Sequence, residues 1–280
     1  MLSPSPTSNL RDRITAPEIL VTPGVYDAFS AYRAEVAGFE AVFVSGSALA
    51  ATHLGRPDIG LLDASELSVI VARIAERVTI PIFVDADQGF GNSYAVARCV
   101  AMLERAGAAG IQIEDQQEIK PASAPLSRPL ISLQIMTDKI HAALDARRDR
   151  SLMISARTDA MSSAGLGEAL ERTDAFIEAG ADMVFAESIS RKRDMEQLVR
   201  TVAGRVPILH NLLREGDDVS SAAELTELGY SVALFPGVAL GAVGAALDNV
   251  FAALRSDPST GKSAPDRIDG AAFLADRSAR

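Results

Sequence analysis

One unit recurs four times along the chain: a helical stretch ends in glycine, and a short apolar run follows within a few residues. The four copies are AEVAGFEAVFVSG (34–46), LERAGAAGIQIED (103–115), FIEAGADMVFAES (176–188) and LTELGYSVALFPG (225–237). Glycine is favoured just after a helix because it adopts left-handed backbone angles without strain. Short runs rich in Val, Ile and Phe are typical of buried parallel strands. The unit therefore predicts helices that each lead into a strand of a parallel sheet.

Four further apolar runs bring the number of predicted strands to eight. They are residues 19–24, 81–87, 152–160 and 206–212, and predicted helices at 28–37, 65–77, 93–106, 132–147, 166–179, 191–203, 220–228 and 239–254 separate the strands. Strands that alternate with helices of this length indicate βαβ units. Eight such units favour a closed (β/α)₈, TIM-like α/β barrel over an open doubly wound sheet. We expect a single barrel domain over 1–280, with a core at about 10–255 and a C-terminal tail at 256–280.

Composition excludes several classes of partner. The formal net charge is −10, which argues against a nucleic-acid or anionic-membrane partner, since these need a basic face. No apolar run approaches the roughly 18 residues of a membrane span. The N-terminal residues lack the apolar core of a secretory signal, and the single cysteine, Cys99, cannot form an intramolecular disulfide. We therefore expect a cytoplasmic protein without nucleic-acid or membrane partners.

Polar residues gather where the predicted strands end, which is the end of a barrel that carries active sites. In chain order they are Ser45, Gly46, Ser47, Asp85, Asp87, Gln88, Glu114, Asp115, Arg157, Asp159, Glu187, His210 and Asn211. Two long segments, 48–66 and 116–132, also follow strand ends, and long loops in compact domains are usually functional or disordered. This end of the barrel is the predicted active site.

Three of these residues form a candidate metal site. Asp85 and Asp87 are two residues apart, so their side chains share one face of an extended chain, and Glu114 ends the next strand. Carboxylates this close repel one another unless a cation or a proton lies between them. All-oxygen ligands suit Mg²⁺, with Mn²⁺ as an alternative. Capping of the following helices by these acids is the competing interpretation.

Arg157 has two interpretations from spacing alone. Its planar guanidinium suits a carboxylate or phosphate of a substrate. An internal ion pair with Asp159 or Glu187 explains the residue equally well. Similarly, Ser45, Gly46 and Ser47 provide either a close backbone approach to a ligand or a tight turn.

Taken together, the motifs resemble those of the isocitrate lyase/phosphoenolpyruvate mutase superfamily over residues of about 10–255. The residues that carry the resemblance are GVYDAFSA (24–31), SGSALAATHLGRPDIGLL (45–62), VDADQGFGN (84–92), GIQIEDQ (110–116), ISARTDA (154–160) and AES (186–188). The resemblance implies a barrel whose last helix is swapped between subunits, usually in a homotetramer. It also implies a small-molecule carboxylate as substrate and a pyruvate-type enolate stabilised by Mg²⁺.

The resemblance also implies residue roles. Mg²⁺ would lie near Asp85, with Asp87, Glu114 and Asp58 acting directly or through waters. The segment 45–47, which is Ser45, Gly46 and Ser47, would cradle the oxygen end of a 2-oxo or 2-hydroxy acid. The substrate-binding candidates beyond that segment are Arg157, Glu187 and Asn211.

The loop that distinguishes reactions within this family departs from both known patterns. The lyase branch carries K-[KR]-C-G-H and the phosphonomutase branch K-x-N-S, whereas this chain has Lys120-Pro121-Ala122-Ser123-Ala124. Lys120 and Ser123 join Arg157 as catalytic candidates. Ala122 can neither transfer a proton nor hydrogen-bond a migrating group, so another base, such as Lys120 or Tyr26, is needed for a lyase.

The expected function is a Mg²⁺-dependent lyase or decarboxylase that cleaves a C–C bond of a small 2-oxo or 2-hydroxy carboxylic acid. Oxaloacetate decarboxylase-like and methylisocitrate lyase-like reactions both fit. The alternative is a P–C bond enzyme, either a phosphonopyruvate hydrolase or a phosphoenolpyruvate phosphonomutase. A third hypothesis is a non-catalytic binding protein on the same barrel, because a fold does not determine a function.

Overall fold

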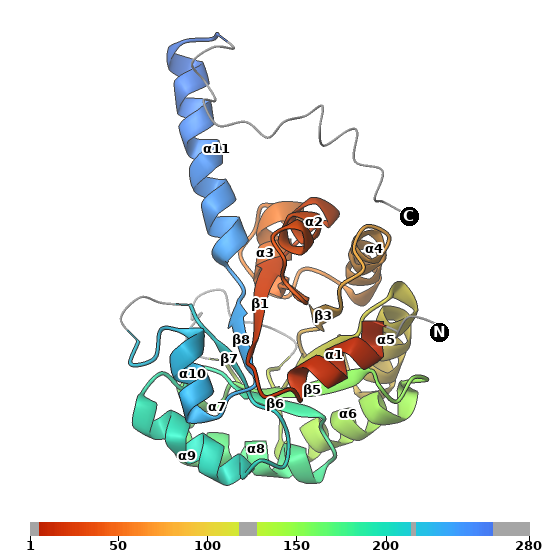
Figure 1. Ribbon diagram of the computed structural model, residues 1–280. Coiled ribbons are helices and arrows are strands. Elements are labelled where there is room, and N and C mark those ends of the chain that lie inside the picture. The colour runs from red at the N-terminus through yellow and green to blue at the C-terminus, as the bar shows by residue number, and fades with distance from the viewer. Residues whose placement is uncertain (1–5, 118–127, 214–216, 260–280) are drawn as a thin grey trace.

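Eight parallel strands form one sheet at the centre of the molecule (Figure 1). A computed structural model describes residues 6–117, 128–213 and 217–259. The strands are β1 (Leu20–Val25), β2 (Val42–Val44), β3 (Ile82–Asp85), β4 (Gly110–Glu114), β5 (Met153–Thr158), β6 (Met183–Ala186), β7 (Leu209–Asn211) and β8 (Val232–Phe235). This arrangement confirms the predicted (β/α)₈, TIM-like barrel.

The barrel closes between β6 and β7. The hydrogen-bonded order of the sheet is β6-β5-β4-β3-β2-β1-β8-β7, which leaves β6 and β7 at its two ends. A parallel bridge between Val184 and Ile208 joins those ends. Because the strands lie parallel around a ring, their carboxyl ends all face the same side of the barrel.

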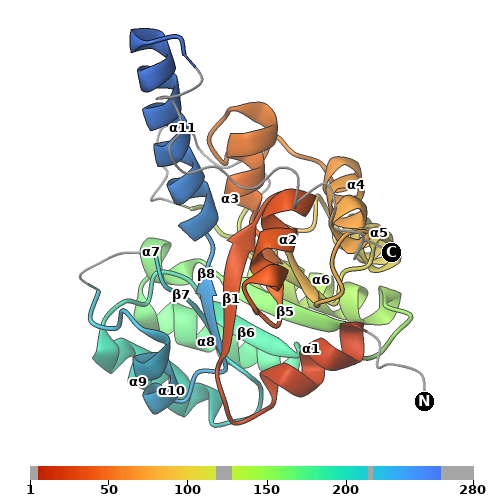
Figure 2. The same cartoon turned by 45° about the horizontal axis from the view of Figure 1, so that its top comes forward.

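Helices follow the strands and cover the outside of the barrel (Figure 2). The longer ones are α1 (Pro6–Ile14), α2 (Ala28–Val36), α4 (Ala64–Ala75), α5 (Ser93–Ala106), α6 (Leu133–Ala146), α8 (Leu166–Glu178), α9 (Lys192–Val202), α10 (Ala222–Leu228) and α11 (Val238–Ser256). Short helices α3 (Gly46–Leu49) and α7 (Ala160–Ser163) begin directly after strands, and a π-helix (Ala50–Leu54) continues α3. The start of the predicted loop 48–66 is therefore helical.

Local sequence explains where several helices begin and end. Asp63 accepts hydrogen bonds from the backbone of Ser65 and Glu66, and the Glu66 side chain accepts one from the backbone of Asp63, so α4 begins with a capping box. At the other end of such helices, Gly107 closes α5 and Gly229 closes α10 in the left-handed region. The glycine positions predicted from the repeated unit are confirmed.

Helix α1 was not predicted. Its Leu10 and Ile14 are each 1% exposed and belong to an apolar cluster that also contains Phe43, Phe83 and Phe185 from inside the barrel. Leu10 lies against the first residue of β4, where a Cβ on Gly110 would come within 2.9 Å of it. Helix α1 thus closes the amino-terminal end of the barrel, opposite the end that carries the polar residues.

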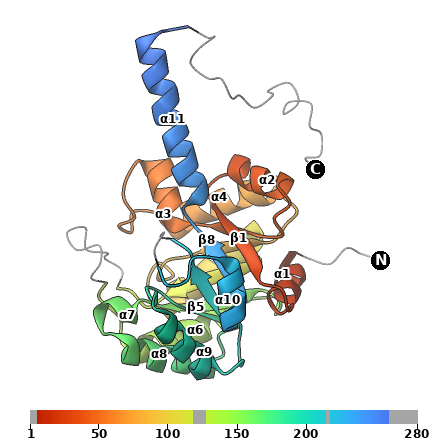
Figure 3. The ribbon, with the colours of Figure 1, turned by 60° about the vertical axis from the view of Figure 1, so that its left-hand side comes forward.

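Helix α11 leaves the barrel after β8 and projects away from it, as the three ribbon views agree (Figure 3). None of its residues is buried. Its exposed apolar side chains recur at intervals of three to five residues: Val238, Val243, Leu247, Phe251 and Leu254. By length and composition it is long and apolar enough to cross a membrane, contrary to the expectation from the sequence. Core helices of soluble proteins share this length and composition.

Candidate active site

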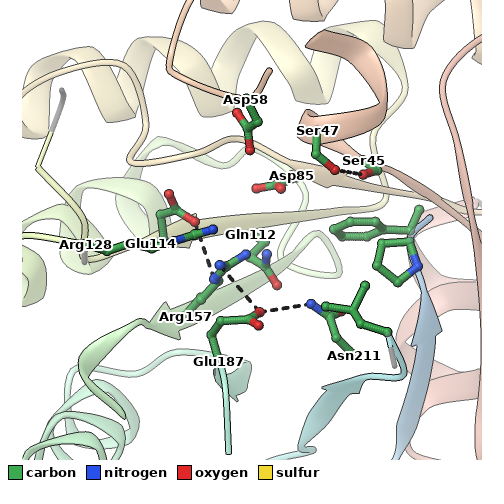
Figure 4. Close-up of a pocket in the computed structure, with 13 residues that line it drawn as sticks. Ser45, Ser47, Asp58, Asp85, Gln112, Glu114, Arg128, Arg157, Glu187 and Asn211 are labelled. Carbon is green, nitrogen blue, oxygen red and sulfur yellow. Dashed lines mark hydrogen bonds and ion pairs between the residues drawn. The ribbon is translucent and has the colours of Figure 1, made fainter. Parts of the chain in front are cut away.

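A cavity of about 120 Å³ opens at the carboxyl ends of the strands (Figure 4). Its lining residues come from most of the strands or the loops after them: Phe43, Ser45, Ser47, Asp58, Asp85, Gln112, Glu114, Arg128, Arg157, Glu187, Asn211, Leu213 and Pro236. A volume this far below the roughly 300–1,000 Å³ of sites for drug-sized ligands suits a small acid.

Asp85, Asp87 and Glu114 meet at one side of this cavity. One carboxylate oxygen of each lies within 4.8 Å of those of the others, which is close enough for a shared metal ion. The backbone between Asp85 and Asp87 is not extended, although their spacing led us to expect that. Strand β3 ends at Asp85, and Asp87 takes a left-handed φ of 47°, so the chain turns at Asp87 instead of continuing as a strand. The backbone N–H of Asp87 donates to the Asp85 carboxylate and fixes that turn.

The segment 45–47 approaches the carboxylates closely. A Cβ on Gly46 would lie 3.3 Å from a carboxylate oxygen of Asp85, so glycine permits this approach of the backbone. The hydroxyls of Ser45 and Ser47 lie 3.1 Å apart and both line the cavity. Asp58 reaches the cavity from the loop after the π-helix, facing Asp85 (Figure 4).

Arg157 is surrounded by three carboxylates. It makes two hydrogen bonds to Asp159, at 3.1 and 2.9 Å, and lies 3.4 Å from Glu114 and 3.5 Å from Glu187. Burial lowers the pKa of Arg157, but the charges of Asp159, Glu114 and Glu187 outweigh burial and raise it well above its usual value. The internal ion pair considered from spacing therefore exists, and Arg157 lines the cavity as well.

Asp159 and Asp115 fix the position of the Arg157 side chain: Asp159 bonds Arg157, and Asp115 bonds the backbone of Asp159. Burial raises the pKa of Asp159, yet the positive charge and hydrogen bonds of Arg157, with help from Arg128 and Gln116, lower it overall. Asp115 is fully buried and accepts hydrogen bonds from the Thr158 hydroxyl and the Asp159 backbone. The orientation of Arg157 is thus set by a network that begins at the end of β4.

Asn211 and Glu187 complete the opposite wall. The Asn211 amide donates to Glu187 at 3.0 Å, and Glu187 in turn faces Arg157. A second cavity, of about 90 Å³, shares Glu187 and Asn211 and is also lined by His210.

The structure brings most of the predicted site residues to one place. Gly46 lies beside the cavity and Asp87 beside its carboxylates, while the other predicted residues that line it directly are Ser45, Ser47, Asp58, Asp85, Glu114, Arg157, Glu187 and Asn211. Lys120, Ala122 and Ser123 lie outside the described residues. Tyr26, considered as a base, does not line the cavity.

Two polar lining residues were missed from the sequence. Gln112 is two residues before Glu114 on β4, so strand alternation alone places both side chains inside the barrel. Arg128 reaches Asp159 at 3.3 Å from the segment before α6. No periodic pattern signals the position of Arg128, because residues 128–132 belong to no helix or strand.

Comparisons with known proteins agree with this geometry. The family model described as phosphoenolpyruvate phosphomutase matches residues 10–255. The chain is 37% identical to 2,3-dimethylmalate lyase of Eubacterium barkeri, over 90% of this chain and 87% of the relative. It is 37% identical to 2-methylisocitrate lyase of Escherichia coli K12, over 94% and 89%. A solved structure of phosphonopyruvate hydrolase with oxalate and Mg²⁺ is similar with a TM-score of 0.82 and 28% identity, over 91% of this chain and 89% of that one.

Proposed function

This chain belongs to the phosphoenolpyruvate mutase/isocitrate lyase superfamily, and we propose that it is a Mg²⁺-dependent lyase of small 2-hydroxy or 2-oxo carboxylic acids that breaks a C–C bond. The observation that carries the proposal is a cluster of three carboxylates, two of which line the same small cavity as a buried arginine. The two lyases described above, each 37% identical over most of both chains, support C–C cleavage.

The residues present fit a divalent metal ion. Asp85, Asp87 and Glu114 offer only oxygen, which Mg²⁺ prefers. Gly46 keeps the backbone close enough for a ligand to touch both the carboxylates and the segment 45–47. Asp58 faces Asp85 across the cavity and would reach the ion directly or through water. The ion would polarise an oxygen of the substrate and neutralise negative charge that develops during bond cleavage.

The cleavage step has a definite electron balance. For a 2-hydroxy acid, a base removes the hydroxyl proton, the C2–C3 bond breaks, and C2 becomes the carbonyl carbon of a 2-oxo acid. The electron pair moves to C3, where a carboxylate on C3 delocalises it as an enediolate, and C3 must then gain a proton. For a 2-oxo acid that loses the carboxylate on C3 as CO₂, the pair remains on the product as a pyruvate-type enolate. Both routes need a site that stabilises negative charge as it develops on oxygen.

The chain's own residues position the substrate for this step. Arg157 presents its guanidinium to the cavity and would bind a substrate carboxylate in its plane, with Asn211 donating beside it. Glu187 and Asp159 hold Arg157 in place, so little reorganisation is needed when substrate binds. The hydroxyls of Ser45 and Ser47 would hold the oxygen end. Lys120 and Ser123 remain candidates for moving the proton.

P–C bond chemistry is the second candidate, favoured by one observation. The chain resembles a phosphonopyruvate hydrolase at 28% identity. Cleavage of the P–C bond of phosphonopyruvate leaves a pyruvate-type enolate, as loss of CO₂ from a 2-oxo diacid does, so the same cavity suits either. The greater identity to C–C lyases ranks this candidate second.

We further propose that α11 packs against a second copy of the chain, within a homotetramer. Five exposed apolar side chains along one helix are unusual for a monomer and indicate a contact surface. The family resemblance supports an exchange of this helix between subunits.

A substrate panel tests the function. Purified protein with Mg²⁺ is incubated with 2,3-dimethylmalate, 2-methylisocitrate, oxaloacetate and phosphonopyruvate, and the products are followed by NMR of ¹H and ³¹P. We expect a 2-oxo acid from at least one of the first three, and at least 100-fold less from Asp85→Asn. Conversion of phosphonopyruvate alone would replace the proposal with its second candidate, and binding without turnover of any compound would contradict both.

A further inference from the structure

Gln112 is a buried amide inside the cavity. It is 1% exposed, and its side chain lines the cavity together with Glu114 and Arg157. Neither its Nε2 nor its Oε1 has a hydrogen-bond partner among the residues that the structure describes.

Aromatic side chains pack inside the barrel on the amino-terminal side of Gln112. The next inward position on β4 in that direction is Gly110, and a Cβ there would lie 2.8 Å from Phe83. Phe43, also in the cavity wall, and Phe83 pack edge to face at 5.2 Å. These rings offer Gln112 no hydrogen-bond partner, whereas the cavity that it lines can admit one.

Native proteins rarely leave both atoms of a buried amide unpaired, because each lost hydrogen bond to water is costly. The cavity, which Gln112 lines, is open to partners for both of its amide atoms. Those partners must include a hydrogen-bond donor for Oε1 and an acceptor for Nε2.

We propose that Gln112 is a specificity-determining residue that selects a substrate carrying a hydroxyl group beside its carboxylate. This inference deepens the proposed function and rests on it. A 2-hydroxy acid can donate its hydroxyl proton to Oε1 and accept from Nε2 through an oxygen. A 2-oxo acid has no donor at that position, so its binding leaves Oε1 buried and unpaired. Gln112 thus favours a 2-hydroxy carboxylate over a 2-oxo one.

One structural alternative competes with this proposal. Ser155 is the partner of Gln112 in the β4–β5 register, and its buried hydroxyl also has no partner among the described residues. A buried water could bridge the two side chains, in which case the amide would serve the fold only. Ser155 does not line the cavity, so its removal separates the two explanations.

Ligand binding tests the proposal without relying on turnover. Malate and succinate differ only by the hydroxyl, and their dissociation constants are measured by calorimetry on the full chain with Mg²⁺. In the wild type we expect malate to bind at least tenfold more tightly. Gln112→Met keeps the shape and removes both polar atoms, and it should reduce that preference by about tenfold or more. If the Gln112→Met variant folds poorly, Gln112→Leu is measured in its place.

Ser155→Ala is the matched control and should keep the wild-type preference. Loss of the preference in Ser155→Ala to the same extent as in Gln112→Met would overturn the proposal in favour of a bridging water. An unchanged preference in Gln112→Met, or no preference in the wild type, would overturn it outright.

Different results would contradict the role of Gln112 and the proposed lyase function. Cleavage of 2,3-dimethylmalate by a protein whose malate preference does not depend on Gln112 contradicts the role of Gln112 alone. A preference that depends on Gln112, in a protein that cleaves none of the C–C substrates, contradicts the proposed function alone.

Discussion

Arg157 shows how a single residue links the stability of this barrel to its site. Its guanidinium neutralises carboxylates from β4, from the end of β5 and from the segment after β6. A buried cation of this kind has no water to replace its partners. The same residue is therefore expected to support the fold and to orient a substrate.

Replacing Arg157 tests its contribution to stability. Arg157→Met leaves Asp159, Glu114 and Glu187 without their cation, so we expect the free energy of unfolding to fall by about 3–5 kcal/mol. Arg205→Met is the matched control, because Arg205 also pairs with two carboxylates, Asp174 and Glu178, but on the surface. Its loss should destabilise the protein much less, because water and salt screen exposed ion pairs. Equal losses in urea denaturation of the two variants would contradict this account.

His210 gives the protein a specific response to acid. Burial lowers the pKa of its imidazole from 6.5 to about 4, although the charge of Asp217 raises it slightly. The unfolded chain therefore binds a proton at a higher pH than the folded chain does. Stability should fall as the pH drops from about 6.5 to about 4, by roughly 3 kcal/mol from this residue, and should level off below pH 4.

Replacing His210 separates its contribution to the acid response from that of the other titratable groups. In His210→Gln, the decrease in unfolding free energy between pH 6.5 and 4 should be smaller than in the wild type. His141→Gln removes an exposed imidazole from α6 and controls for the loss of a histidine as such. Parallel pH profiles for His210→Gln and the wild type would show that His210 is not the cause.

Residues on regular strands were predictable, whereas those held by turns or loops were not. Glu114 is the last residue of β4 and Arg157 the next to last of β5, and both were expected at strand ends because they follow apolar runs. Asp87 reaches the same cluster only through a left-handed turn, which the spacing argument did not anticipate. Gln112 could have been predicted by strand alternation from Glu114, but it was not considered because it is uncharged.

At the scale of elements, the glycines that follow helices in the repeated unit differ in how closely their neighbours pack. Gly107 and Gly38 both lie at φ near +90° to +100° just after a helix. A Cβ on Gly107 would lie 2.7 Å from the Cβ of Ala75, whereas a Cβ on Gly38 would meet nothing within 4 Å. The two positions share backbone strain and differ in steric contact.

Alanine substitutions at these glycines should therefore differ. Gly38→Ala should cost about 1 kcal/mol, from the backbone alone. Gly107→Ala adds an overpacked contact between α5 and α4 and should cost about 1–3 kcal/mol more. Thermal unfolding of both variants measures the difference, and an equal effect would mean that the helices shift freely to accept the methyl group.

Two helical segments were not predicted from the sequence, and their composition explains why. Helix α1 has few apolar residues and begins at a proline, and only the four-residue spacing of Leu10 and Ile14 indicates a buried face. The helical start of the predicted loop 48–66 lacks a strong apolar period, since most of Ala50–Leu54 is exposed. Tertiary contacts of Leu10 and Ile14 with the barrel, more than local pattern, stabilise α1.

At the scale of the whole molecule, α11 points to assembly. The helix contacts the barrel only near its start and carries apolar side chains on its outer part. Association with another copy would bury this surface, and a proposed homotetramer would have four times the 29.5 kDa mass of the chain.

Light scattering after size-exclusion chromatography tests this assembly. Phe251 is 61% exposed near the far end of α11, and Phe251→Glu should lower the molar mass of the particle. Tyr94→Glu, at an 85% exposed tyrosine on α5, should leave the mass unchanged. A wild-type protein that runs as a monomer at micromolar concentration would contradict the proposal.

The metal dependence of C–C cleavage tests the central claim most directly. The protein is incubated with 2,3-dimethylmalate, first with EDTA and then with added Mg²⁺, and the reaction is followed by ¹H NMR. Cleavage of the C2–C3 bond requires equal amounts of pyruvate and propionate. We predict that both products appear only after Mg²⁺ is added, and that Asp85→Asn abolishes them. Equal product formation in EDTA, or an unchanged rate in Asp85→Asn, would contradict a metal-assisted reaction at Asp85, Asp87 and Glu114.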